Sequence, residues 1–174
     1  MRTIKAKPLS KEAFAPYGSY ASITSPEGFH MGDFYNDQVL LPVSGKKHGE
    51  RAHQALKHAL GLCSGEIILL HVTEPLSQIV GGEAHTELKR EEAAKGLTLL
   101  CPLIEILEKD GVSFHTRVEE GTPAETIVRV ADEENADLIV MFTDGRDGLG
   151  DLLIGSITER VLRNTDTPLL AVRH

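Results

Sequence analysis

The chain has little positive charge and no long apolar run. Its 174 residues contain 18 lysines and arginines against 26 aspartates and glutamates, a formal net charge of −8. Such a chain offers no basic face to neutralise a nucleic-acid backbone or to coat an anionic membrane. No apolar run approaches the roughly 18 residues that span a bilayer, and the N-terminus lacks the apolar segment of a signal peptide. We therefore expect a cytoplasmic protein that binds neither nucleic acid nor membrane.

Cysteine is scarce as well, with Cys63 and Cys101 as the only two. Both fall on stretches of helical periodicity, at no spacing that suits a metal ion. We expect two small buried side chains and no disulfide.

Histidine is more frequent, with eight in the chain, but its spacing predicts no metal site. His48, His53 and His58 are five residues apart, which spreads them around a helix instead of stacking them on one face. His71 and His115 fall on predicted strands, where we expect hydrogen-bonded structural histidines and no catalytic role.

The aromatic residues divide the chain into two parts. Residues 1–37 hold all 3 tyrosines and most of the 5 phenylalanines, with prolines and glycines that interrupt any period. From Gln38 onward, short apolar runs alternate with amphipathic segments, which is typical of a parallel sheet with crossover helices. We predict an N-terminal extension, residues 1–37, and one domain, residues 38–174.

The second part predicts an α/β fold with a doubly wound, open, parallel five-stranded sheet in the order 3-2-1-4-5 and helices on both faces. The expected strands are residues 38–43, 66–72, 112–118, 137–142 and 168–172. The expected helices are residues 48–63, 84–110 and 122–135, and a last helix that starts at 155–156. The third strand alternates apolar and polar residues, which suits an edge position. Leu97, Leu100, Ile104 and Leu107 form the predicted inner stripe of the second helix.

Sheets of this kind bind ligands beyond the carboxyl ends of the strands, where the strand order reverses. Here that point lies between the first and fourth strands, so residues 42–45 and 143–156 should meet there. Gly145 permits close approach of a backbone, and Gly155-Ser156 opens a helix whose N–H groups and dipole attract anions. This predicts a phosphate site. The alternative is structural, with Ser156 as a simple helix N-cap and the glycines as loop residues.

Several motifs together resemble one known family. TDGRDGLGDLLIGSITERVLR at residues 143–163, followed by TPLLAVR at 167–173, closely resembles the C-terminal signature of the universal stress protein family. The likeness continues upstream at residues 40–43, 120–124 and 136–141, so it covers about 38–174. It implies the fold predicted above, a homodimer through the last strand (Pro168 to Arg173), and membership of either an ATP-binding or a non-binding branch.

The binding branch carries the pattern Gly-x2-Gly-x9-Gly-Ser/Thr, and this chain keeps its phosphate half. The resemblance implies that the candidate nucleotide contacts are Val43, Ser44, Gly145, Gly155, Ser156, Ile157 and Thr158. Phe142 replaces the first glycine, and Ser44 replaces the acid that typically contacts the adenine side. Phe142 either fills the ribose volume or points into the core beside the last strand. We therefore expect a partly degenerate pocket that binds ATP or a related nucleotide weakly.

Three functions remain open. The first is a regulatory or protective homodimer without catalysis, since no Ser/His/Asp spacing stands out. The second is a slow ATP-hydrolysing switch in which Asp144 or Asp147 holds a metal ion. The third is an interaction module with a vestigial pocket, in which the aromatic extension recruits a protein partner. Residues 7–18 of that extension are similar to the start of ureidoglycolate lyase, over a stretch too short to make that protein's barrel.

Overall fold

A computed structural model describes residues 36–44, 49–75, 82–143 and 155–172. They form a five-stranded sheet in the order β3-β2-β1-β4-β5, in which every neighbouring pair is parallel. This confirms the predicted fold class and strand order. The strands are β1 (Asn36–Pro42), β2 (Cys63–Thr73), β3 (Ser113–Glu120), β4 (Leu138–Phe142) and β5 (Leu169–Val172).

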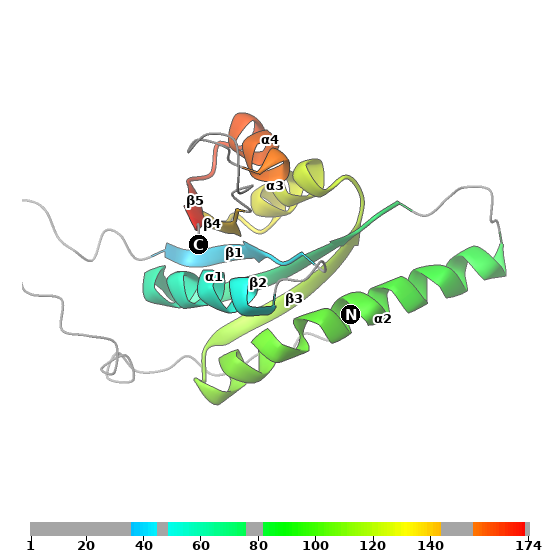
Figure 1. Cartoon of the computed structure of the whole chain (residues 1–174), viewed down its shortest axis with the longest axis horizontal. Helices are drawn as coiled ribbons and strands as arrows, with labels where there is room; N and C mark the ends of the chain where they lie inside the picture. Colours follow the sequence, from blue (N-terminus) through cyan, green and yellow to red (C-terminus); the bar gives the residue numbers. More distant parts are fainter. Residues whose placement is uncertain (1–35, 45–48, 76–81, 144–154, 173–174) are drawn as a thin grey trace, which may run out of the picture.

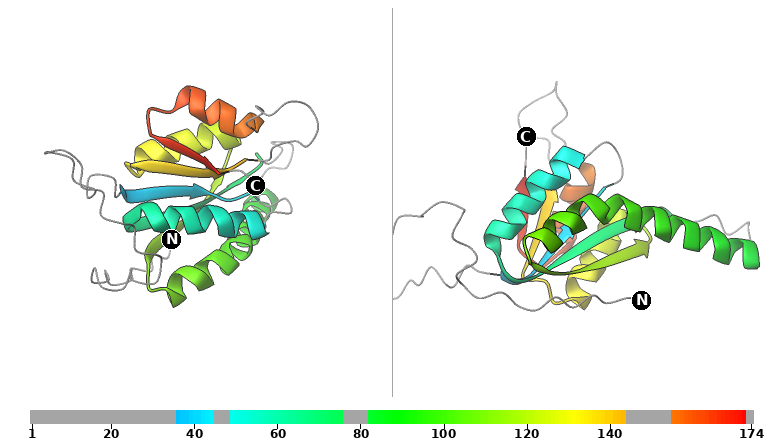
Figure 2. Two further views of the ribbon diagram at one scale, coloured as in Figure 1. Left: turned by 60° about the vertical axis from the view of Figure 1, so that its left-hand side comes forward. Right: turned by 90° about the horizontal axis from the view of Figure 1, so that it is seen from below.

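Two helices cover each face of the sheet (Figure 1 and Figure 2). One face carries α1 (Gly49–Leu62) and α2 (Glu83–Lys109), and the other carries α3 (Pro123–Glu133) and α4 (Ser156–Asn164). Successive strand residues point to opposite faces, so Val39 and Leu41 enter the core under α1 and α2, while Leu40 enters the core under α3 and α4. Burial on both faces explains the continuous apolar run of β1.

The prediction that both cysteines are buried and lie on helices is half right for each of them. Cys63 is buried but is the first residue of β2, and burial raises the pKa of its thiol to about 11. Gly65 lets β2 start this early, because it passes so close to the Asp37 carbonyl that a Cβ would overlap that group. Cys101 lies on α2 as expected but is exposed, and both thiols are free.

The inner stripe of α2 is also displaced from the predicted one. The buried residues of α2 are Gly96, Leu100, Leu103 and Leu107. Leu97 is 45% exposed, because it follows Gly96 by one residue and so points about 100° away from the face that Gly96 presents to the sheet. Glycine carries no apolar side chain, so hydrophobic periodicity alone could not predict that Gly96 packs against the sheet.

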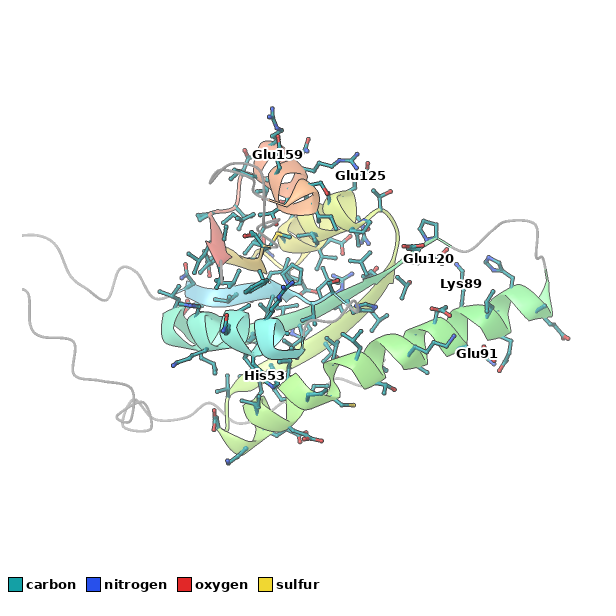
Figure 3. The ribbon with its side chains drawn as sticks, in the orientation of Figure 1. His53, Lys89, Glu91, Glu120, Glu125 and Glu159 are labelled. Atoms are coloured by element: carbon teal, nitrogen blue, oxygen red, sulfur yellow. The ribbon has the colours of Figure 1, made fainter. Side chains whose placement is uncertain are left out.

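Strands β2 and β3 run past the end of β1 as a two-stranded ribbon, with His71 paired to Val118 and Thr73 to Glu120. The 27-residue helix α2 lies along this ribbon, and its N-terminal half projects beyond the rest of the sheet (Figure 1). Lys89 Nζ of α2 lies 2.9 Å from Glu120 Oε2 at the end of β3 (Figure 3). This ion pair ties the projecting half of α2 to the ribbon.

Residues 1–35 lie outside the described ranges, so the boundary between extension and domain stays a prediction. Among the helices that the structure describes, none combines the length and the apolar character needed to cross a bilayer.

Candidate functional site

The chain leaves the neighbouring strands β1 and β4 in opposite directions. These strands pair in parallel, with Val39 opposite Leu138 and Leu40 opposite Ile139. The helix after β1 covers one face, and the helix after β4 covers the other (Figure 2). Both strands therefore end at the same edge of the sheet, at the point where doubly wound folds bind their ligands.

Val43 and Ser44 follow β1 at this edge, as predicted. The Val43 N–H donates to the Leu70 carbonyl oxygen at 2.7 Å, and its own carbonyl oxygen lies 2.9 Å from His71 Nδ1. The Val43 side chain is buried in the core under α1 and α2, while Ser44 is exposed. Of this pair, only the Ser44 side chain is free to face a ligand, and Val43 would contribute through its backbone.

The start of α4 supplies the second half of the candidate site. Gly155 is the N-cap and Ser156 the first helical residue, and no side chain caps this end. Ser156 is therefore not the N-cap that the structural alternative made it. The first N–H groups of a helix have no partner within it, so this end can bind an anion.

The side chains in the first turn of α4 differ in exposure. Ser156 and Ile157 are exposed, whereas Thr158 is buried and can offer only its backbone to a ligand outside the helix. Gly145, the remaining predicted contact, lies outside the described residues, as do Asp144 and Asp147.

Thr143 is a polar residue of this edge that the sequence analysis did not single out. It follows β4 directly and is 1% exposed, and its N–H donates to the Val172 carbonyl oxygen at 2.9 Å. Its Oγ1 has no hydrogen-bond partner within the described part of the chain. Strand alternation places this side chain on the same face as Met141, the face of α3 and α4. Buried hydroxyls are usually paired, so this one marks a place where a polar group of a ligand or a water molecule fits. A hydroxyl residue directly after a buried strand was the available sequence signal.

Phe142 points into the core beside β5, which is the second of the two positions expected for it. It is half-buried and packs against the core under α1 and α2, and it pairs with Val172 of β5. The guanidinium carbon of Arg51, in the first turn of α1, lies 5.5 Å from the centroid of its ring. The ring is thus directed toward α1 and away from the face on which α4 begins.

A second polar cluster joins β3 to α3. The Arg117 guanidinium lies 2.6 Å from Glu119, 2.9 Å from Glu133 and 2.8 Å from Glu134. Arg129 binds Glu119 and Glu133 at 3.0 and 2.6 Å.

The shifted pKa values of this cluster follow from its ion pairs. Burial acts to raise the pKa of Glu119, but hydrogen bonds from Arg117 and Arg129 outweigh it and hold that pKa below the usual value. Hydrogen bonds from the same two arginines lower the pKa of Glu133. Shifted pKa values often mark functional sites, yet each shift here is explained by a partner inside the cluster. We assign the cluster a structural role.

No set of three or more histidine, cysteine, aspartate or glutamate side chains in the described ranges is arranged to hold a metal ion. His115 lies 3.3 Å from Glu66 and 3.4 Å from Glu134, which places it beside the ion-pair cluster. His71 is hydrogen-bonded to the backbone, as expected of a structural histidine.

Comparisons with known proteins agree with this architecture. Universal stress protein MJ0531 of Methanocaldococcus jannaschii is 34% identical over 151 residues, which cover 82% of this chain and 85% of that protein. The solved structure of MJ0577 from the same organism superimposes with a TM-score of 0.63 at 28% identity and covers 81% of this chain and 97% of that one.

Two structures of the same fold contain nucleotides. A universal stress protein in complex with cAMP gives a TM-score of 0.59 at 21% identity, over 79% of this chain and 97% of that one. A family member from Arabidopsis thaliana with AMP bound gives 0.57 at 19%, over 79% and 91%. At these identities the likeness shows the fold alone.

The model of the universal stress protein family matches residues 36–173, from the start of β1 to one residue beyond β5. These matches bring no support for a likeness of residues 7–18 to ureidoglycolate lyase, and those residues lie outside the described ranges. The chain belongs to the universal stress protein family.

Proposed function

We propose that this protein acts by binding a nucleotide through its phosphates at the carboxyl ends of β1 and β4, and that it regulates or protects as a homodimer without catalysing a reaction. The observation that carries the proposal is the buried Thr143 hydroxyl without a partner among the described residues. It lies on the face of the sheet from which the uncapped helix α4 starts, next to the end of β1. A buried polar group and an anion-binding helix end thus belong to one edge of the sheet.

The ligand class follows from the relatives and from this chain's own residues. Relatives of the same fold bind AMP and cAMP, which makes an adenine nucleotide the first candidate. The backbone N–H groups at Ser156 to Thr158 suit a phosphate. Ser44 stands where the family pattern has an acid for the adenine side, so recognition of the base should be weak. We expect phosphate contacts to dominate and the dissociation constant for ATP to be no tighter than about 10 μM.

Positive charge near this edge favours the same ligand class. Arg51 lies in the first turn of α1 with its guanidinium over Phe142, the last residue of β4. This arrangement holds a cation at the carboxyl edge of the sheet, on the face opposite α4. A polyphosphate carries more negative charge than a monophosphate and should gain more from it.

The proposed homodimer forms through β5, one of the two edges of the sheet. Ala171 of β5 is exposed, and Leu169 and Leu170 are half-buried. In the adjacent α4, Ile157 is 43% and Leu162 50% exposed. Unpaired apolar edges invite a second strand. The other edge, β3, carries the ion-pair cluster of Arg117 on one face, and charge of this kind discourages pairing with another chain.

Calorimetric titration of the purified protein with ATP, ADP, AMP, tripolyphosphate and adenosine tests the proposal. We expect ATP and tripolyphosphate to bind with similar, weak affinities, and adenosine to bind at least about tenfold more weakly than ATP. Adenosine binding as well as ATP would contradict recognition through phosphate. If none of the five binds, the nucleotide function is wrong. Release of inorganic phosphate from bound ATP, at a rate proportional to protein concentration, would contradict a role without catalysis.

A further inference from the structure

We propose that His71 is a positioning residue that holds the end of β1 in place for the nucleotide and couples this end to helix α2 through Gly96. The inference rests on the proposed function, because it concerns the backbone at Val43 and Ser44 on the ligand-binding edge. His71 neither contacts the start of α4 nor belongs to the ion-pair cluster, so this role is separate from both.

His71 holds the end of β1 through a hydrogen bond to Val43. The His71 Nδ1 atom lies 2.9 Å from the Val43 carbonyl oxygen. Because a carbonyl oxygen can only accept, Nδ1 carries the hydrogen and donates it. Regular pairing of β1 with β2 ends at Pro42 opposite Leu70, and the Val43 N–H still donates to the Leu70 carbonyl. The imidazole therefore extends the link between β1 and β2 by one residue, just before the exposed Ser44.

Helix α2 packs against the same imidazole ring at Gly96. A Cβ at Gly96 would lie 2.9 Å from His71 Cδ2 and 2.8 Å from Val118 Cγ1, closer than side chains tolerate. Only glycine allows α2 to lie this near the β2–β3 ribbon. Lys89 and Glu120 hold the projecting half of the helix to the same ribbon (Figure 3).

The imidazole is thus in contact with the backbone of β1 on one side and with α2 on the other. A shift of α2 toward the ribbon would displace the ring and weaken its bond to Val43. A ligand that fixes Val43 and Ser44 would in turn stabilise the position of the ring, and through it the docking of α2. Such coupling is reciprocal by thermodynamic necessity.

Two pairs of variants test this role by titration with ATP. Gly96→Ala introduces the crowding methyl group, while Gly61→Ala adds the same group to α1 at a position with nothing within 4 Å. His71→Leu removes the donor, while His71→Asn places an amide N–H near the position of Nδ1. We expect Gly96→Ala and His71→Leu to weaken ATP binding about two- to tenfold. Gly61→Ala and His71→Asn should bind within about twofold of the unmodified protein. Equal affinity of His71→Leu and His71→Asn would overturn the proposal.

Nuclear magnetic resonance of the ligand-free variants separates this inference from the nucleotide function. The long-range ¹H–¹⁵N spectrum of the neutral His71 ring should show the Nδ1–H tautomer. Gly96→Ala and His71→Leu should shift the Val43 and Ser44 resonances, while Gly61→Ala should not. If the protein binds no nucleotide but these shifts occur, the proposed function fails and the coupling stands. If Val43 and Ser44 stay unchanged in folded Gly96→Ala and His71→Leu, the coupling is wrong whatever the protein binds.

Discussion

The guanidinium carbon of Arg51 lies 5.5 Å from the centroid of the Phe142 ring, so the first turn of α1 is joined to the last residue of β4 by a cation–π contact. Phe142 also packs against the core under α1 and α2. We predict that Phe142→Gly lowers the free energy of unfolding by about 2–4 kcal/mol, because it removes both contacts and opens space under α1. Phe142→Leu keeps most of the packing and should cost less than about 1.5 kcal/mol. Denaturant unfolding measures both, and an unchanged midpoint for Phe142→Gly would show that the ring is not packed there.

Ser44→Asp tests the base side of the nucleotide site. Ser44 is exposed, so a carboxylate there can face a ligand without burial. Restoring the acid of the family pattern should tighten ATP binding at least about tenfold, or 1.4 kcal/mol. Ser44→Asn has nearly the same shape without the charge and serves as the control. Calorimetric titration that gives the same affinity for both variants would argue against a carboxylate contact with the adenine side.

Arg117 should matter more for stability than an exposed arginine with a comparable pair. Its side chain is only 17% exposed and meets three glutamates, whereas Arg163 is 73% exposed and pairs with Glu159. We expect Arg117→Met to lower the free energy of unfolding by about 1–2 kcal/mol, because it removes the arginine partner of Glu134 and leaves Glu119 and Glu133 with Arg129 alone. Arg163→Met should change it by less than about 0.5 kcal/mol. Similar losses for the two variants in thermal or denaturant unfolding would contradict the structural role of the cluster.

The same cluster should make the protein sensitive to acid. Hydrogen bonds from Arg117 and Arg129 lower the pKa values of Glu119 and Glu133 in the folded protein below the ordinary value of 4.5. Groups with a lowered folded-state pKa contribute stability above their unfolded pKa and lose it as the pH falls through the folded value. We predict that the free energy of unfolding decreases as the pH is lowered from about 5 to about 3. Arg117→Met should show a smaller decrease than Arg163→Met, and parallel curves for the two variants would contradict this assignment.

Ala171 offers the cleanest test of the proposed homodimer. It is the exposed residue of β5, whereas Leu170 and Val172 belong to the core under α1 and α2, so a charge at either of those positions would unfold the domain as well. We expect the unmodified protein to sediment as a dimer at micromolar concentration and Ala171→Lys to sediment as a folded monomer. A monomeric unmodified protein, or a dimer that Ala171→Lys leaves intact, would exclude association through this edge.

The elements of the fold could be predicted from the sequence because their signals are local. Continuous apolar runs marked β1 and β4, and the alternation in residues 112–118 placed β3 at the edge. The early start of β2 escaped prediction because it depends on Gly65 passing the Asp37 carbonyl of a strand far away in the sequence. The contact of Gly96 with His71 also joins residues far apart in the sequence. It was missed because a glycine gives no hydrophobic signal.

The site was predicted only in part. The position of Val43, Ser44 and the start of α4 at one sheet edge follows from topology, which the sequence pattern revealed. The direction of the Phe142 side chain required the strand register, and the orphaned hydroxyl of Thr143 required knowledge of its burial. Thr158, which lies beyond the serine of the family pattern, was expected as a contact, yet its side chain is buried.

Mapping the backbone amide resonances during a titration with ATP reports both whether the nucleotide binds and where it binds. We predict that saturable shifts concentrate at Val43 and Ser44 and at Gly155 to Thr158, the two described segments at the carboxyl ends of β1 and β4. Resonances of α3 around Glu133, on the ion-pair cluster, should remain unchanged. Absence of any saturable shift at millimolar ATP, or shifts that concentrate on β3 and α3 instead, would contradict the account.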